Sequence, residues 1–265
     1  MDELAKYNQE RWSALVEAGV EYTKPFTDFD REKAADYLDR WSDITRLQLD
    51  FSGKDVLCLA SGGGQQTVCF SLLGAKSVTV IDLTPGQLEK DAEMAELYGY
   101  PLRIEQGDMR DLSRFADQSF DIVYQAYSIN FVPDPLPVLA EVSRIIRPDG
   151  LYYLQFGNPL WNMEETDWTE KGYPIRQPYI QGQPSSPEDL PWDVHQPDGS
   201  SIKVKGPKEF THTLGTLVNG LGDNGFMIFA MIEVPEGDAT ADPGSWEHFK
   251  AYLPLWPAVW SRKMR

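Results

Sequence analysis

Residues 55–82, DVLCLASGGGQQTVCFSLLGAKSVTVID, decide the fold of this chain. This stretch predicts an apolar strand over residues 55–60, a glycine turn over residues 61–64 and a helix over residues 65–73. A second apolar strand is predicted over residues 78–81, and it ends at Asp82. A strand that is apolar throughout is buried on both faces. The stretch therefore predicts two strands of a parallel sheet that has helices on each side.

The same alternation continues toward the carboxyl end. Helices are predicted over residues 85–98, 135–146 and 210–224, and strands over residues 102–105, 120–125, 151–156, 226–234 and 257–262. Right-handed crossovers bring the carboxyl ends of parallel strands to one edge of the sheet. In open α/β sheets the ligand crevice lies at that edge, where the strand order reverses. We therefore expect a three-layer α/β fold with its site at this edge.

Two segments fall outside this alternation. Residues 1–48 carry apolar side chains at three- and four-residue spacing, which predicts a helical N-terminal cap on a core formed by residues 49–157 and 207–265. Residues 158–206 show little periodicity. This insertion contains Trp161, Trp168 and Trp192. Aromatic residues in an irregular segment favour an ordered lid over disorder, so we expect a substrate lid here.

Composition limits the partners and the location of the protein. The chain has 265 residues, with 41 acidic against 24 basic side chains and a formal net charge of −17. Nucleic acids and anionic membranes bind Lys/Arg surfaces, so this balance argues against both and favours a small-molecule substrate. No signal peptide or transmembrane run is recognisable, which predicts a cytoplasmic protein. Cys58 and Cys69 lie in apolar surroundings without zinc-ligand spacing, so no metal site is expected.

The glycine turn and the following acid predict a nucleotide site. Gly62, Gly63 and Gly64 let the backbone approach a ligand closely because no Cβ intervenes. Asp82 ends the next strand, where a carboxylate can accept both hydroxyls of a ribose. The fingerprint of dinucleotide sites requires a third glycine at the sixth position from Gly62. Thr67 stands there instead, which disfavours a nicotinamide dinucleotide.

Residues 56–64, VLCLASGGG, resemble the first motif of class I S-adenosylmethionine-dependent methyltransferases. Cys58 stands where that family often has an acid, and Ala60 replaces its first glycine. Further blocks match in chain order: residues 80–85 (VIDLTP), 107–109 (GDM), 120–126 (FDIVYQA), 147–151 (RPDGL), 212–214 (HTL), Leu221 and 225–226 (GF). The resemblance covers residues 50–157 and 207–265. It implies a Rossmann-like sheet of seven strands, of which six are parallel and one is antiparallel.

The resemblance also implies S-adenosylmethionine as the cofactor. In such a site Asp82 holds the ribose, Asp108 accepts a hydrogen bond from the adenine amino group, and Met109 lies against the adenine ring. The complete set of residues implied to bind the cofactor is Ala60, Ser61, Gly62, Gly64, Asp82, Leu83, Gln87, Asp108, Met109, Gln125 and Ala126.

Three residues are candidates for binding the methyl acceptor or for removing its proton. Transfer requires a nucleophile aligned with the methyl carbon, and an O–H acceptor must also lose a proton. Of the three histidines, His212 is the favoured base, because it opens the predicted helix after the insertion and the helix dipole would keep its ring neutral. Tyr127 and Asn130, in the loop after the fourth strand, are expected to hydrogen-bond the acceptor. Catalysis by positioning alone is the alternative.

The sequence thus predicts methyl transfer to an oxygen or nitrogen of a small aromatic or apolar molecule. Two alternatives stay open at this point. One is a nucleotide-dependent oxidoreductase, and the other is a non-catalytic module that binds S-adenosylmethionine. The identity of the acceptor and the oligomeric state do not follow from the sequence.

Overall fold

The computed structural model describes residues 1–161, 167–175, 177–185, 191–196, 198–234 and 236–265. Parts of the predicted lid, including residues 162–166 and 186–190, lie outside the described residues. Across the described part of the chain, no helix has the length and apolar character needed to cross a membrane.

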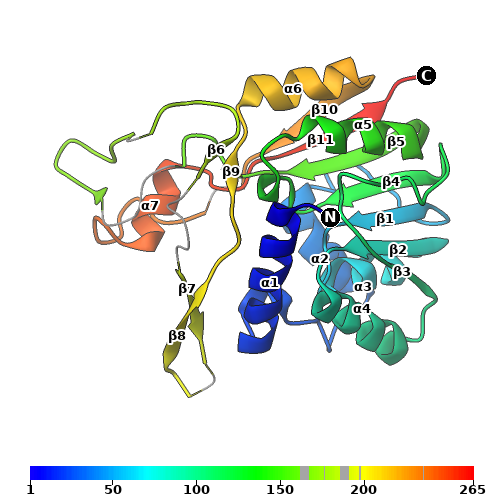
Figure 1. Cartoon of the computed structure of the whole chain (residues 1–265), viewed down its shortest axis with the longest axis horizontal. Helices are drawn as coiled ribbons and strands as arrows, with labels where there is room; N and C mark the ends of the chain where they lie inside the picture. Colours follow the sequence, from blue (N-terminus) through cyan, green and yellow to red (C-terminus); the bar gives the residue numbers. More distant parts are fainter. Residues whose placement is uncertain (162–166, 176, 186–190, 197, 235) are drawn as a thin grey trace.

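A seven-stranded sheet forms the centre of the fold (Figure 1). Its strand order is β10-β11-β5-β4-β1-β2-β3. The strands are β1 Asp55–Leu59, β2 Ser77–Asp82, β3 Leu102–Gln106, β4 Phe120–Gln125, β5 Ile146–Gln155, β10 Phe226–Ile232 and β11 Ala258–Lys263. Strand β11 runs antiparallel to both β10 and β5, and the other neighbours pair in parallel. The predicted mostly parallel sheet with one antiparallel strand is confirmed.

Helices cover both faces of the sheet, as predicted. One face carries α5 Leu136–Ile145 and α6 Leu214–Asp223, and the other carries α2 Arg31–Ser42, α3 Gln65–Leu72 and α4 Pro85–Tyr98. Side chains alternate across a strand. In β1, Leu57 and Leu59 therefore belong to the core beneath α5 and α6, while Val56 and Cys58 belong to the core beneath α2 and α3. All four side chains are fully buried, which explains why this strand is apolar throughout.

The helix predicted over residues 210–224 begins later than expected. Phe210–Thr211 is a short strand, β9, which pairs with β6 at Gln183–Pro184. Helix α6 starts after Thr213, whose hydroxyl accepts a hydrogen bond from the backbone N–H of Thr216. Such a cap satisfies one of the free N–H groups at a helix start. His212 therefore precedes the helix instead of opening it.

Part of the insertion is more regular than predicted. Strands β7 Pro191–His195 and β8 Ser201–Lys205 form an antiparallel hairpin. Trp192 and Val194 alternate with polar residues, and Trp192 lies opposite Val204, as the two-residue period of a half-buried strand requires. The hairpin packs on helix α1 Glu3–Ala18, which lies between the hairpin and the rest of the fold (Figure 1). A short helix, α7 Trp246–Tyr252, lies in the connection before β11.

Candidate active site

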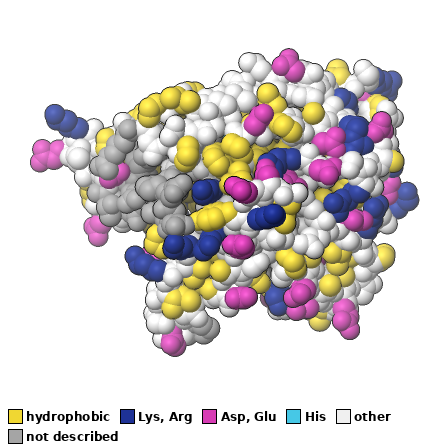
Figure 2. All heavy atoms as spheres, viewed as in Figure 1, with side chains coloured by type: hydrophobic (Ala, Val, Ile, Leu, Met, Phe, Trp, Pro, Cys, Tyr) yellow, Lys and Arg dark blue, Asp and Glu magenta, His cyan; other side chains and the backbone are white. Residues whose placement is uncertain are grey.

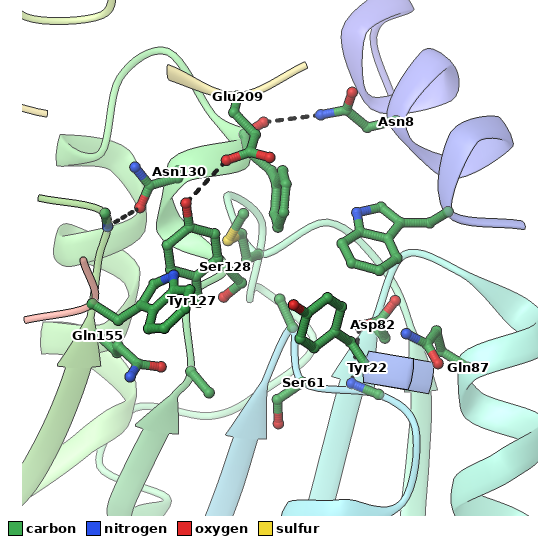
Figure 3. A pocket seen from close by; sticks show the side chains of 18 of the residues that line it. Asn8, Tyr22, Ser61, Asp82, Gln87, Tyr127, Ser128, Asn130, Gln155 and Glu209 are labelled. Carbon is green, nitrogen blue, oxygen red and sulfur yellow. Dashed lines mark hydrogen bonds between the residues drawn. The ribbon is translucent and has the colours of Figure 1, made fainter. Parts of the chain in front are cut away.

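A cavity of about 1040 Å³ opens at the carboxyl ends of the central strands (Figure 3). Its floor contains Ala60 after β1, Asp82 at the end of β2, Ala126 after β4 and Gln155 at the end of β5. Residues of α1, of the 3-10 turn Glu21–Thr23 and of the insertion complete the wall: Asn8, Trp12, Tyr22, Trp161 and Trp192. The edge where β1 has β4 on one side and β2 on the other is the expected ligand edge.

The loop after β1 is shaped for close approach. Ala60 has φ 47°, a left-handed backbone that favours glycine, at the position where the resembling family has its first glycine. Gly62 has no space for a side chain, since an added Cβ would lie 2.6 Å from Gln87 Cβ and 3.1 Å from Asp82 Cγ. Glycine at this position therefore lets the loop pack closely against Gln87 and Asp82, and Ala60, Ser61 and Gly62 line the cavity.

A buried acid that the sequence analysis missed holds this loop. Asp91 of α4 accepts hydrogen bonds from the Gly63 N–H at 3.0 Å and from the Thr67 hydroxyl at 2.8 Å. Its side chain is fully buried, and burial raises its pKa to about 7. Asp91 follows the buried Leu88 and precedes the buried Met94 by three residues each. This helical spacing was the available signal that Asp91 faces the core.

Asp82 faces both the cavity and the loop. Its carboxylate accepts hydrogen bonds from the Gly62 N–H at 3.1 Å and the Thr84 N–H at 2.8 Å. Burial raises the pKa of Asp82, and these N–H groups counteract the rise. Nearby, Ser61 Oγ and Gln87 Oε1 are buried without a hydrogen-bond partner among the described residues. Buried polar atoms rarely stay unpaired, so this end of the cavity suits a polar ligand.

The adenine-binding candidates lie beside an ion-pair network. Arg110 donates to both carboxylate oxygens of Asp108, with a shortest distance of 2.6 Å from Nη2 to Oδ2. The same guanidinium donates to Asp2 at 2.7 Å, and Asp2 caps the start of α1. The Arg110 hydrogen bond holds the pKa of Asp2 at about 2. The network ties α1 to the Asp108 loop, and Met109 lines the same part of the cavity.

Two of the implied cofactor residues do not line the cavity. Gly64 faces α4, where an added Cβ would lie 2.6 Å from Met94 Cγ. Gln125 is fully buried, accepts a hydrogen bond from the Tyr152 hydroxyl at 2.5 Å and donates to Met109 Sδ at 3.3 Å. Both residues therefore lie behind the residues that line the cavity. The remaining implied residues line the cavity: Ala60, Ser61, Gly62, Asp82, Leu83, Gln87, Asp108, Met109 and Ala126.

The other end of the cavity contains a hydroxyl–carboxyl pair. The Tyr127 hydroxyl donates to Glu209 Oε2 at 3.0 Å, and both side chains line the cavity (Figure 3). Burial raises the pKa of Glu209 to about 7, while the Tyr127 hydrogen bond lowers it. Burial and the Glu209 charge hold the pKa of Tyr127 well above its usual range. A carboxyl that titrates near neutral pH is suited to proton transfer.

Two asparagines position this pair. Asn130 accepts a hydrogen bond from the Gly157 N–H at 2.8 Å and donates to the Phe210 carbonyl at 3.0 Å. Asn8 of α1 accepts from the Lys208 N–H at 2.8 Å and donates to the Lys208 carbonyl at 3.2 Å. Both amides therefore bind backbone next to Glu209. Asn130 lines the cavity, but its hydrogen bonds to backbone indicate that it positions the segment that carries Glu209.

His212 lies outside the set of residues that line the cavity. Its ring is fully buried, and both ring nitrogens have partners: Nδ1 lies 2.8 Å from Gln181 Nε2, and Nε2 lies 3.0 Å from the Ile129 carbonyl oxygen. The amide of Gln181 donates to Nδ1, so Nε2 carries the proton and donates to Ile129. Burial lowers the pKa of His212 and keeps the ring neutral. The hydrogen bonds of the His212 ring connect segments of the fold.

We expect His212→Gln to lower stability more than activity. The substitution leaves at least one partner of the ring, the partly buried Gln181 or the buried Ile129 carbonyl, without its hydrogen bond, which should lower the free energy of unfolding by about 1–3 kcal/mol. The maximum methylation rate of the folded variant should stay within a few fold of wild type. Thermal unfolding and steady-state kinetics measure the two effects. A rate loss of about 10² or more at unchanged stability would instead make His212 the base.

The glycine loop, the acid at the end of the second strand and the cavity at the sheet edge together define the site of a class I S-adenosylmethionine-dependent methyltransferase. A family model described as a methyltransferase domain matches residues 57–154. An uncharacterized methyltransferase of Bacillus subtilis, YbaJ, is 32% identical over 242 residues, which cover 88% of this chain and 91% of the relative. The chain belongs to this methyltransferase family, and S-adenosylmethionine is its cofactor.

Other similar proteins agree with this assignment. A ubiquinone biosynthesis O-methyltransferase of Xanthomonas oryzae is 34% identical over 117 residues, 42% of this chain and 46% of that protein. The solved structure of an S-adenosylmethionine-dependent methyltransferase from Mesorhizobium loti has a TM-score of 0.58 at 18% identity, covering 86% of this chain and 99% of that one. The likeness to the solved structure shows the fold. The family assignment is a methyltransferase, so it decides against the two alternatives that the sequence left open, an oxidoreductase and a non-catalytic binding module.

Proposed function

We propose that this methyltransferase transfers the methyl group to an oxygen or nitrogen of a small molecule with an apolar or aromatic body. The observation that carries the proposal is one continuous cavity with two different ends. The end beside Asp82 and the glycine loop is polar, and the end beside Tyr127 and Glu209 is bounded by aromatic rings. A cofactor at the first end would place its reactive group toward the second.

The polar end fits the cofactor. Gly62 lines the cavity, and Asp82 offers a carboxylate for ribose hydroxyls. Gln87 and Ser61 have buried polar atoms without a hydrogen-bond partner among the described residues. Asp108 and Met109 would hold the adenine. S-adenosylmethionine supplies a methyl group on a positively charged sulfur. The protein's part is to orient the acceptor, to exclude water and to remove a proton where one must leave.

The acceptor end fits a small apolar molecule. Tyr127 contacts Phe131 with ring centroids 6.3 Å apart, Phe131 contacts Trp12 at 5.4 Å, and Trp12 contacts Trp192 at 5.6 Å. With Tyr22, 6.3 Å from Trp192, these rings form what we call the aromatic wall. All five line the cavity. Ligand sites of this size are mostly apolar with a few placed polar groups, which here are Tyr127 and Glu209.

The surface supports a small acceptor over a nucleic acid. On the face shown in Figure 2, Lys and Arg side chains lie among Asp and Glu side chains. With a net charge of −17, such a surface is unsuited to phosphate backbones. We therefore place the acceptor inside the cavity and not on the surface.

The test is a screen of amines, phenols and alcohols with the purified protein and S-adenosylmethionine. We expect formation of adenosylhomocysteine together with a product that carries one more methyl group on nitrogen or oxygen. Asp82→Ala, in which cofactor binding should be weakened, is the matched blank. Methylation on carbon, or no transfer to any of these acceptors by a protein that binds adenosylhomocysteine, would contradict the proposal.

A further inference from the structure

The charges that line the cavity are unbalanced. The described lining contains five acids, Glu21, Asp82, Asp108, Asp167 and Glu209, and two cations, Lys24 and Arg110. Both cations are already paired: Lys24 lies 2.8 Å from Glu21, and Arg110 binds Asp108 and Asp2. Acids therefore outnumber cations among the described lining residues, and an anionic acceptor would meet no unpaired cation among them.

Glu209 is the acid of the acceptor end. Its Oε2 accepts the Tyr127 hydrogen bond, and no Lys, Arg or His of the described chain forms an ion pair with it. The carboxylate is held in place by the segment that Asn8 and Asn130 bind on either side. Burial raises the pKa of Glu209 to about 7, so a cation beside it would favour its ionised form.

The rings next to Glu209 also suit a cation. Tyr127 touches the carboxyl through its hydroxyl and continues into the aromatic wall through Phe131. Aromatic faces attract ammonium groups, and an apolar body is stabilised by packing against the same rings. An amine attached to an apolar body is therefore complementary to both features. A neutral alcohol with the same apolar body could donate one hydrogen bond to the carboxylate, but it carries no positive charge to pair with Glu209 or to lie against the ring faces. A carboxylate would be repelled.

We propose that Glu209 receives the amino group of the acceptor, so that the methyl acceptor is an amine whose apolar body lies on the aromatic wall. This inference rests on the proposed function and narrows its acceptor to nitrogen. The proton balance is simple. The ionised Glu209 takes one proton from the bound ammonium group and becomes a neutral acid. The freed nitrogen lone pair forms the new N–C bond as the S–C bond breaks, leaving a methylated ammonium and a neutral thioether.

Three probes that differ in one group test the head group that the site selects. Phenethylamine, phenethyl alcohol and hydrocinnamate share a phenethyl body and carry an amine, a hydroxyl and a carboxylate. We measure methyl transfer to each and binding of each to the protein saturated with adenosylhomocysteine. We expect kcat/KM for the amine to exceed that of the alcohol by at least about 10-fold, and hydrocinnamate not to bind.

Glu209→Gln tests the residue. The glutamine keeps the size of the side chain and can accept the Tyr127 hydrogen bond, but it can neither pair with an ammonium nor take its proton. We expect kcat/KM for phenethylamine to fall by about 10²-fold, as when one partner of a buried charge pair is removed. Adenosylhomocysteine affinity should stay unchanged. Glu93→Gln, which removes the same charge from the exposed face of α4, should behave as wild type.

The outcomes separate this inference from the proposed function. Transfer to phenethyl alcohol at a rate equal to or above that of the amine overturns the amine assignment and leaves oxygen methylation standing. Amine turnover that is insensitive to Glu209→Gln overturns the role of Glu209. Failure of every amine in the wider screen, with transfer to phenols or alcohols, also overturns the inference. The head-group comparison uses wild-type protein, so it decides the question even if Glu209→Gln does not fold.

Discussion

Asp82→Ala is expected to weaken the binding of adenosylhomocysteine by about 1–3 kcal/mol, the usual range for hydrogen bonds to a charged group. The carboxylate of Asp82 lies in the cavity at the end of β2, where a ribose diol would donate to it. Calorimetry at pH 7 measures the change in dissociation constant. An unchanged affinity would remove Asp82 from the cofactor site.

The alanine variant also removes a support of the loop, because Asp82 accepts the Gly62 and Thr84 N–H groups. Asp82→Asn is the matched variant, since its amide oxygen keeps one such bond and its charge is absent. Burial raises the pKa of Asp82. In wild type, affinity should therefore fall as the pH drops through that pKa, because the protonated carboxyl accepts fewer hydrogen bonds. In Asp82→Asn this pH dependence should disappear, and a pH dependence that persists in this variant would show that another group causes it.

The central fold was predictable because burial on both faces leaves few choices of residue. β1 requires apolar side chains on each side, so Val56, Leu57, Cys58 and Leu59 predict a buried strand without any long-range information. The predicted helix over residues 85–98 matches α4, Pro85–Tyr98, since proline at its start and Gly99 at its end mark the bounds locally.

The acceptor end was only partly predictable. Tyr127 was singled out, but its partner Glu209 lies 82 residues away, in a segment without periodicity. Nothing local indicates that Glu209 is held beside β4. That placement depends on Asn8 from α1 and Asn130 from the loop after β4, both of which bind neighbouring backbone. Such tertiary contacts determine the protonation of a carboxyl, and the sequence does not show them. The sequence therefore indicated a histidine as the base from its residue type alone.

His212 illustrates the same limit from the other side. Its neutral ring was expected from a helix dipole, but α6 begins at Leu214, and burial is the main cause of the lowered pKa. The hairpin β7–β8 was missed because prolines around it obscured the alternation of Trp192 and Val194. In both cases the structure depends on contacts with residues far away in the sequence. For the hairpin, these contacts are made with the apolar side of α1.

The second large effect is expected at Gly62. Gly62→Ala places a Cβ 2.6 Å from Gln87 Cβ and 3.1 Å from Asp82 Cγ. Gln87 Cβ is anchored on α4, so the loop after β1 has to move, at a cost of about 1–3 kcal/mol in stability, as for overpacked sites. The movement displaces the part of the cavity wall that Ser61 and Gly62 form, where we expect the cofactor to bind. We expect adenosylhomocysteine affinity to fall by roughly 10-fold or more, through the loss of 1.4 kcal/mol or more of contact.

Gly215→Ala is the matched control for this substitution. Gly215 lies in α6, and an added Cβ meets no atom within 4 Å. Alanine favours helices over glycine by up to about 1 kcal/mol, so this variant should melt at the same or a slightly higher temperature and bind adenosylhomocysteine as wild type does. If Gly62→Ala also keeps wild-type affinity, the loop can yield without loss, and close backbone approach at Gly62 is not what selects the cofactor. If Gly62→Ala loses affinity for adenosylhomocysteine while Asp82→Asn retains most of the wild-type affinity, the shape of the loop contributes more to cofactor binding than the charge of Asp82.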